Sequence, residues 1–284
     1  MTATTMTTRL QGNFAPVQSE LFVSGLKMRG EKLQNLNGTL YRNGPNPRFP
    51  SGHWFSGDGM LHAICLQNGT VSYRNRWVRT PKFLAEERAG RALYRDFGGK
   101  LPTAPAWAPD DLGSANTNIV WHAGRLLALE EAHPPTEIDA GSLETRGYLN
   151  PAWSADRSPD PSLGLQAGPF TAHPKIDPMT GEMLFFGYNA SGPFTPAIRF
   201  GVLDAAGVLR RHETFDAPCS SMVHDFMITE RHVLFPVPQG LAVWLNNIIP
   251  QMERSPAFPF RPNTLSQAEE ATAHCVIVTT TNLP

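Results

Sequence analysis

Two of the nine histidines lie where an imidazole could bind a metal ion. His173 stands in a proline-bracketed stretch, residues 170–178, that reads as the end of a strand. His224 stands at the start of another expected strand, within residues 221–227. An imidazole held at a strand end is a rigid ligand for a transition metal. The two histidines are far apart in the sequence, so their spacing alone argues only weakly for a metal site.

The other seven histidines share no motif with a potential partner residue. For these we expect structural or surface roles: His53, His62, His122, His133, His212, His232 and His274.

The composition is that of an ordinary globular protein, with 41% hydrophobic and 17% charged residues in a chain of 284. A net charge of -1 without a basic stripe argues against nucleic acid or an anionic membrane surface as a partner. The three cysteines share no motif spacing, which favours a reducing compartment. No apolar run is long enough for a signal peptide or a membrane span, so the sequence predicts a cytoplasmic protein.

Short apolar runs separated by glycine and proline predict many strands joined by turns. Ala123-Gly124, between two such runs, indicates a hairpin turn. The best helix candidate is residues 82–94. Sequential hairpins without helices between them favour an all-β fold, either a sandwich, a barrel or a propeller. The expected strands are residues 38–42, 60–66, 70–78, 118–122, 125–130, 182–188 and 232–237.

Several phrases, in the same order, resemble the carotenoid cleavage oxygenase family, whose members include lignostilbene dioxygenases. The resemblance covers about residues 15–238. The phrases that carry it are residues 37–47, 53–62, 115–120 and 125–131, the stretch around His173, His224-Asp225-Phe226, and residues 234–237.

The resemblance implies a seven-bladed β-propeller whose axis holds an Fe(II) ion ligated by four histidines. It implies that O2 is used to split a carbon–carbon double bond of a polyene or stilbene into two carbonyl products. His173 matches the first iron ligand of the family and His224 the second. Glu131 matches a carboxylate that accepts the outer N–H of a ligating imidazole and so orients it. Peripheral membrane contact for uptake of an apolar substrate would be compatible with this function, and no specific protein partner is indicated.

The sequence departs from the family after Pro238. The phrases that carry the third and fourth iron histidines do not occur, and the surroundings of His274 match neither. We therefore expect a flexible N-terminus over 1–20, about four blades of an incomplete propeller over 21–238, and an atypical tail over 239–284. Such a truncated, N-terminal piece would expose strand edges and bind Fe(II) loosely. We expect it to be inactive by itself.

Two further positions bear on the substrate. Where stilbene-cleaving relatives use a tyrosine and a lysine to bind the substrate phenol, this chain has Phe97 and Glu130, although Tyr94 lies close to the first position. A carboxylate cannot stabilise a phenolate, so we expect an apolar apocarotenoid or another extended alkene rather than a 4-hydroxystilbene.

Three interpretations stay open. The chain could be part of an iron-dependent dioxygenase that cleaves an alkene, or of a polyene isomerase on the same scaffold. It could also be a non-catalytic fragment or binding module, because two ligand phrases are missing. The first and last interpretations can both hold: the family can consist of enzymes while this chain is inactive.

Overall fold

The computed structural model describes residues 12, 15–30, 35–51, 53–96, 98–149 and 168–237, and the backbone of 274–279. This part of the chain is mostly β-structure, as predicted, and is built from antiparallel sheets. It divides into two compact units. Unit 1 comprises Met1–Glu130 and Pro135–Leu149, and unit 2 comprises Glu131–Pro134 and Asn150–Pro284.

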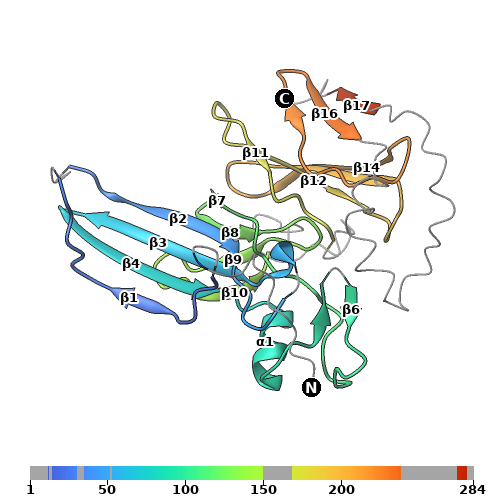
Figure 1. The fold of residues 1–284 in the computed structure, drawn as a ribbon. Helices are drawn as coiled ribbons and strands as arrows, with labels where there is room; N and C mark the ends of the chain where they lie inside the picture. Colours follow the sequence, from blue (N-terminus) through green and yellow to red (C-terminus); the bar gives the residue numbers. More distant parts are fainter. Residues whose placement is uncertain are drawn as a thin grey trace. The chain divides into compact units, whose positions relative to one another are not determined.

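Unit 1 contains two four-stranded antiparallel sheets (Figure 1). In the first, the spatial order is β1-β4-β3-β2, and in the second it is β10-β9-β8-β7, which is a simple meander. Four-stranded antiparallel sheets of this kind are the units from which propeller blades are made. The bounds are β1 Leu21–Val23, β2 Gly38–Pro45, β3 Gly59–Gln67, β4 Thr70–Trp77, β7 Asn118–His122, β8 Arg125–Leu129, β9 Thr136–Ile138 and β10 Thr145–Tyr148, with a short 3₁₀ turn η3 at Trp54–Ser56 and a small ribbon of β5 Tyr94–Arg95 and β6 Gly98–Lys100.

The turn between β7 and β8 contains two residues in the left-handed region, of which the second is glycine. Ala123 and Gly124 have φ values of 50° and 72°, and they join β7 to β8 with His122 opposite Arg125. Two consecutive positive φ values define the type I′ turn, whose twist matches that of a hairpin. The predicted hairpin turn at Ala123-Gly124 is therefore confirmed.

The two sheets of unit 1 share one apolar core. Because side chains alternate between the faces of a strand, β3 turns Leu61 and Ala63 toward the same cluster as Leu126 and Ala128 of β8 and Ile138 of β9. These five residues are at most 7% exposed.

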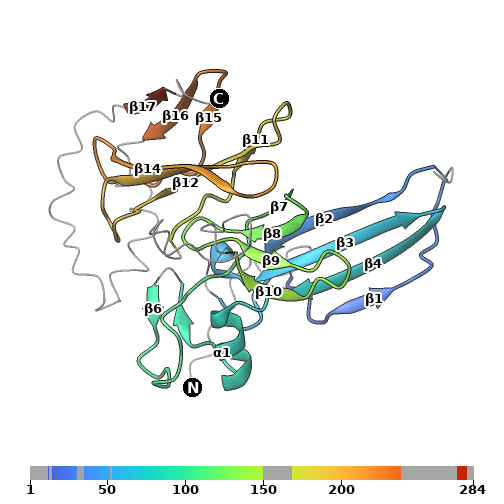
Figure 2. The same cartoon turned by 180° about the vertical axis from the view of Figure 1, so that it is seen from behind.

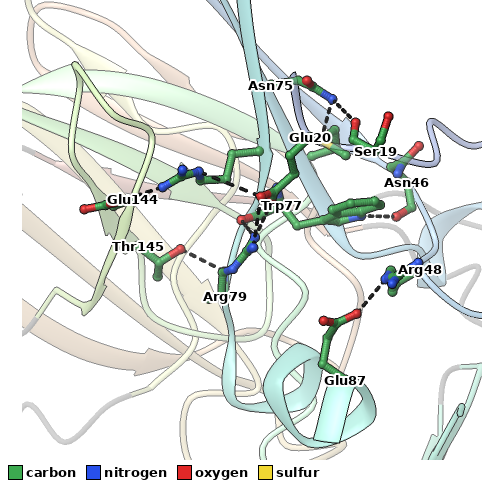
Figure 3. A network of polar contacts seen from close by, with 12 residues as sticks. Ser19, Glu20, Asn46, Arg48, Asn75, Trp77, Arg79, Glu87, Glu144 and Thr145 are labelled. Atoms are coloured by element: carbon green, nitrogen blue, oxygen red, sulfur yellow. Dashed lines mark hydrogen bonds and ion pairs between the residues drawn. The ribbon is translucent and has the colours of Figure 1, made fainter. Parts of the chain in front are cut away.

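A polar network fastens the segment before β1 to the rest of unit 1 (Figure 3). The carboxylate of Glu20 accepts the backbone N–H of Trp77 at 2.9 Å and pairs with the guanidinium of Arg79. The indole N–H of Trp77 donates to the carbonyl of Asn46 at 3.0 Å, and the backbone N–H of Arg79 donates to the hydroxyl of Thr145 at 2.8 Å. The network thus links the N-terminal segment, the first sheet and β10.

The one α-helix among the described residues, α1, spans Pro81–Ala89. Thr80 caps it by accepting the backbone N–H of Phe83, and proline occupies the first turn, where no N–H is needed. Gly90 ends it in the left-handed conformation. The predicted helix over 82–94 is therefore too long at its C-terminal end, because the glycine stops it and Tyr94 belongs to β5.

Unit 2 contains a four-stranded meander, β11-β12-β13-β14, and a three-stranded sheet, β15-β16-β17 (Figure 2). Its core is rich in phenylalanine, with Phe186, Phe200, Phe226 and Phe235 buried together. The bounds are β11 Lys175–Ile176, β12 Met183–Tyr188, β13 Ala197–Leu203, β14 Leu209–Asp216, β15 Met227–Ile228, β16 His232–Val237 and β17 His274–Thr279.

All seven expected strands exist, with ends that differ by at most a few residues. The sequence did not predict β13 and β14, nor the shorter strands other than β15, which begins at Met227, three residues after the predicted start at His224. Phe97, most of the expected flexible N-terminus and all of the expected tail except the backbone of β17 lie outside the described residues. Within the described part of the chain, no helix has the length and apolar character that a membrane crossing requires.

Candidate metal centre

His173 is placed by a segment that packs closely on the end of β12. The backbone N–H of Thr171 donates to the carbonyl of Phe186 at 2.6 Å, and the hydroxyl of Thr171 accepts the backbone N–H of His173 at 2.9 Å. A Cβ atom on Gly187 would lie 2.0 Å from the carbonyl oxygen of Pro169, so only glycine permits this approach. The histidine is therefore held two residues before β11 by contacts with the neighbouring strand. The prediction that it ends a strand was wrong, because the segment before it packs on β12 as a loop and not as a strand.

His224 lies just before β15 and is held by its buried neighbours. Val223 and Phe226 are 1% and 2% exposed, whereas the side chain of His224 is 65% exposed. Asp225 forms an ion pair with Lys175 of β11, with 2.7 Å between the Oδ1 and Nζ atoms. This ion pair joins the segment that carries His224 to the one that carries His173.

Glu131 connects to His224 through a carboxylate–imidazole hydrogen bond. Its Oε1 atom pairs with Nδ1 of His224, and its Oε2 atom accepts the hydroxyl of Tyr188 at 2.9 Å. Both oxygens of Glu131 are therefore engaged. A carboxylate at Nδ1 keeps the proton on that nitrogen and leaves the lone pair of Nε2 available.

The two histidines turn their Nε2 atoms toward each other, 3.1 Å apart. The potential ligand atoms of Glu131, His173 and His224 all lie within 4.8 Å of one another. Burial, and secondarily the neighbouring His224, lowers the pKa of His173 and so favours its neutral form.

This arrangement fits a transition-metal ion. Metal–imidazole bonds are about 2.1 Å long, so two nitrogens in adjacent coordination positions lie roughly 3 Å apart, and a nitrogen-donor pair suits iron, zinc or copper. Glu131, whose oxygens already hold His224 and Tyr188, is suited to orienting a ligand rather than to being one.

Among the residues that the structure describes, this is the only group of three or more histidine, cysteine or acidic side chains close enough to share a metal ion. The structure thus brings His173, His224 and Glu131 together. Their roles as metal ligands and as an orienting carboxylate stay predictions. Glu130 is half-buried at the end of β8 and belongs to unit 1, whereas Phe97 lies outside the described residues. The proposed substrate role of these two residues stays a prediction.

Sequence reasoning missed Tyr188. It ends the expected strand 182–188, and no motif around it indicates that its hydroxyl meets a carboxylate from residue 131.

Comparison with known proteins identifies the family. The family model described as retinal pigment epithelial membrane protein (RPE65) matches residues 14–268, a range that continues beyond Pro238 into the segment expected to be an atypical tail. Resveratrol cleavage oxygenase 1 of Aspergillus fumigatus is 37% identical over 233 residues, which is 81% of this chain and 44% of that protein. Isoeugenol monooxygenase of Pseudomonas nitroreducens is 34% identical over 81% of this chain and 46% of that protein.

Solved structures agree with this assignment. The lignostilbene dioxygenase of Pseudomonas brassicacearum superposes with a TM-score of 0.67 and 34% identity, covering 81% of this chain and 46% of that one. The cobalt-substituted ACO of Synechocystis gives a TM-score of 0.65 and 30% identity over 78% of this chain and 47% of that one. The chain spans somewhat less than half the length of these relatives. It belongs to the carotenoid cleavage oxygenase (RPE65) family.

Proposed function

We propose that His173 and His224 are two ligands of an Fe(II) centre in a non-haem dioxygenase that cleaves a carbon–carbon double bond. The single observation that carries this proposal is that the Nε2 atoms of the two histidines lie 3.1 Å apart, while Glu131 binds the Nδ1 atom of His224. Family members are iron-dependent oxygenases that cleave carotenoids or stilbenes, which favours iron over other metals that imidazoles bind.

In the proposed reaction, one O2 molecule and one alkene give two carbonyl products, so that the double bond is broken and each new carbonyl group receives one oxygen atom. Bound iron would supply the redox chemistry that O2 needs to react with an alkene. His173 and His224 would hold the ion, and Glu131 would keep the proton of His224 on Nδ1 and make the ring a stronger donor. The Lys175–Asp225 ion pair would keep the two histidine segments in register.

For the substrate, we propose an extended apolar alkene, a carotenoid, apocarotenoid or stilbene-like molecule. Glu130 and Phe97 argue against a 4-hydroxystilbene, because neither can stabilise a phenolate. The names of the relatives do not decide the matter, since they include both a resveratrol cleavage oxygenase and carotenoid 9,10(9',10')-cleavage dioxygenases.

A second possibility is that this chain does not cleave the substrate by itself. Within the described residues, two imidazoles face the candidate centre, whereas the family resemblance implies four, and the seven-bladed propeller would be represented here by about four blades. Two ligands would bind Fe(II) loosely and would not fix its coordination.

An isotope experiment tests both possibilities. The purified chain, loaded with Fe(II) without oxygen, would be mixed with an apocarotenal or with resveratrol under ¹⁸O2, and the products analysed by mass spectrometry. Two labelled carbonyl products, lost in the His173→Ala/His224→Ala double variant, would support cleavage by this chain. Products that persist in the double variant would overturn the assignment of these histidines, and no cleavage of either substrate would favour the second possibility.

A further inference from the structure

We propose that Tyr188 is a positioning residue of the metal centre: its hydroxyl fixes the carboxylate of Glu131, and through it the tautomer of His224. The consequence for metal binding rests on the proposed iron site. The hydrogen-bond relay itself can be measured without metal.

Tyr188 is well anchored for this role. It is the last residue of β12, where it pairs with Ile198 of β13. Its ring is partly buried against the phenylalanine-rich core of unit 2. The strand end that carries it is also packed tightly, because Gly187 admits the carbonyl of Pro169 against β12. The hydroxyl of Tyr188 is therefore presented from a rigid element.

Glu131, by contrast, lies outside any strand or helix. A carboxylate held at one oxygen can still rotate about its terminal side-chain bond, since that torsion is broad. Held at both oxygens, it has a defined plane. Of the two side chains that bind this carboxylate, His224 is 65% exposed and lies in a loop. Tyr188, 2.9 Å away, belongs to a packed strand, so it is the partner that can fix the orientation of the carboxylate.

The orientation of Glu131 decides which nitrogen of His224 is protonated. With Oε1 at Nδ1, the proton is held there and Nε2 presents a lone pair toward His173. If the carboxylate turned away, the form protonated at Nε2 would gain population. That form places a proton between the two Nε2 atoms, so His224 could not bind a metal ion through Nε2.

The test is a comparison of tautomers in the metal-free chain. Nitrogen NMR of ¹⁵N-histidine-labelled protein would give the ratio of Nδ1–H to Nε2–H forms of His224 for the native chain and for Tyr188→Phe. We expect the ratio to fall about threefold to tenfold, less than a direct hydrogen bond to a charged group would give, because Tyr188 acts through Glu131. The affinity for Co(II), the metal used as probe, should fall by a similar factor.

Tyr41→Phe is the matched control. It also removes one tyrosine hydroxyl, which donates to the carbonyl of Ala140 at 2.9 Å within unit 1. This variant should leave the ratio for His224 and the Co(II) affinity unchanged. Replacement of Tyr188 by p-aminophenylalanine keeps the ring and restores a donor, so it should return the ratio toward the native value.

The outcomes separate this inference from the proposed function. An unchanged tautomer ratio in Tyr188→Phe, or a ratio that p-aminophenylalanine does not restore, would overturn the role of Tyr188. A shifted and restored ratio supports it even if the native chain binds no Co(II), a result that would count against the proposed metal centre alone.

Discussion

Replacing Phe235 by alanine should loosen unit 2 selectively. Phe235 lies on β16, is fully buried, and contacts the rings of Phe186, Phe200, Phe215 and Phe226 at centroid distances of 5.4, 6.1, 5.6 and 5.7 Å. Removing it would leave a cavity at the centre of this cluster.

The expected loss in the free energy of unfolding can be worked out from these contacts. Phenylalanine-to-alanine changes in cores cost about 3–5 kcal/mol, and each aromatic pair contributes roughly 0.5–1.5 kcal/mol beyond area burial. With four ring partners, we expect a loss of about 4–5 kcal/mol. Because Phe226 follows His224 by two residues, the cavity should also loosen the segment that carries this histidine.

Native-state hydrogen exchange resolves this loss by region. Since about 1.4 kcal/mol corresponds to a factor of ten, amides of β13 and β16 should exchange roughly a thousandfold faster in Phe235→Ala. The matched control is Phe83→Ala, which removes a ring that is 2% exposed and stacks on Trp77 in unit 1. That variant should accelerate exchange in β3 and β4 and leave β13 unchanged. A change of less than tenfold in β13 and β16 of Phe235→Ala would refute the description of this core.

Two further changes test local features. Gly201→Ala should destabilise the chain by about 1–3 kcal/mol in urea denaturation, because the new Cβ atom would lie 2.4 Å from the ring of Phe185. Asp139→Asn should cost about 0.5–1 kcal/mol at pH 7, a value that is small because the side chain is 33% exposed and water screens its charge. The backbone N–H of Ser142 and then the guanidinium of Arg146 hold the pKa of Asp139 well below its usual range. The stabilising effect of its charge is therefore present above the ordinary aspartate pKa of about 3.9 and is lost as the pH falls below it.

Each of these two substitutions has its own control experiment. Gly44→Ala in β2 places a Cβ atom with nothing within 4 Å, so it should leave stability nearly unchanged. An equal loss in Gly44→Ala and Gly201→Ala would show that the Phe185 contact is not the cause. For Asp139→Asn, the stability difference from the native chain should shrink between pH 5 and pH 3 (about one unit either side of the ordinary pKa), and a constant difference would contradict the role of the charge.

The sequence predicted those strands whose pattern is local. Strands β7 and β8 are short apolar runs on either side of the turn at Ala123-Gly124. Their bounds could therefore be predicted within a residue. β13 was missed because Arg199 breaks its apolar run and because Gly201 is a glycine, which is uncommon in strand interiors. Gly201 is explained only by the ring of Phe185 on the neighbouring strand, which is a tertiary contact.

In the candidate site, too, local patterns could be predicted from the sequence and tertiary contacts could not. His173 and His224 could be singled out from their expected positions at strand ends and from the family resemblance. That their Nε2 atoms meet at 3.1 Å depends on how β11, β12 and β15 are packed, which no spacing in the sequence encodes. Tyr188 could not be predicted at all, because its importance comes from the carboxylate that it contacts.

The most direct test of the proposed metal centre is a Co(II) titration of the purified chain, followed by its absorption spectrum and by the metal bound per chain in equilibrium dialysis. We predict saturation at one ion per chain in the native protein and an affinity at least tenfold lower in the His173→Ala/His224→Ala variant. His212→Ala/His232→Ala, which removes two other histidines of unit 2, should bind as the native chain does. Equal binding by the native chain and the His173→Ala/His224→Ala variant would contradict the assignment of the metal centre.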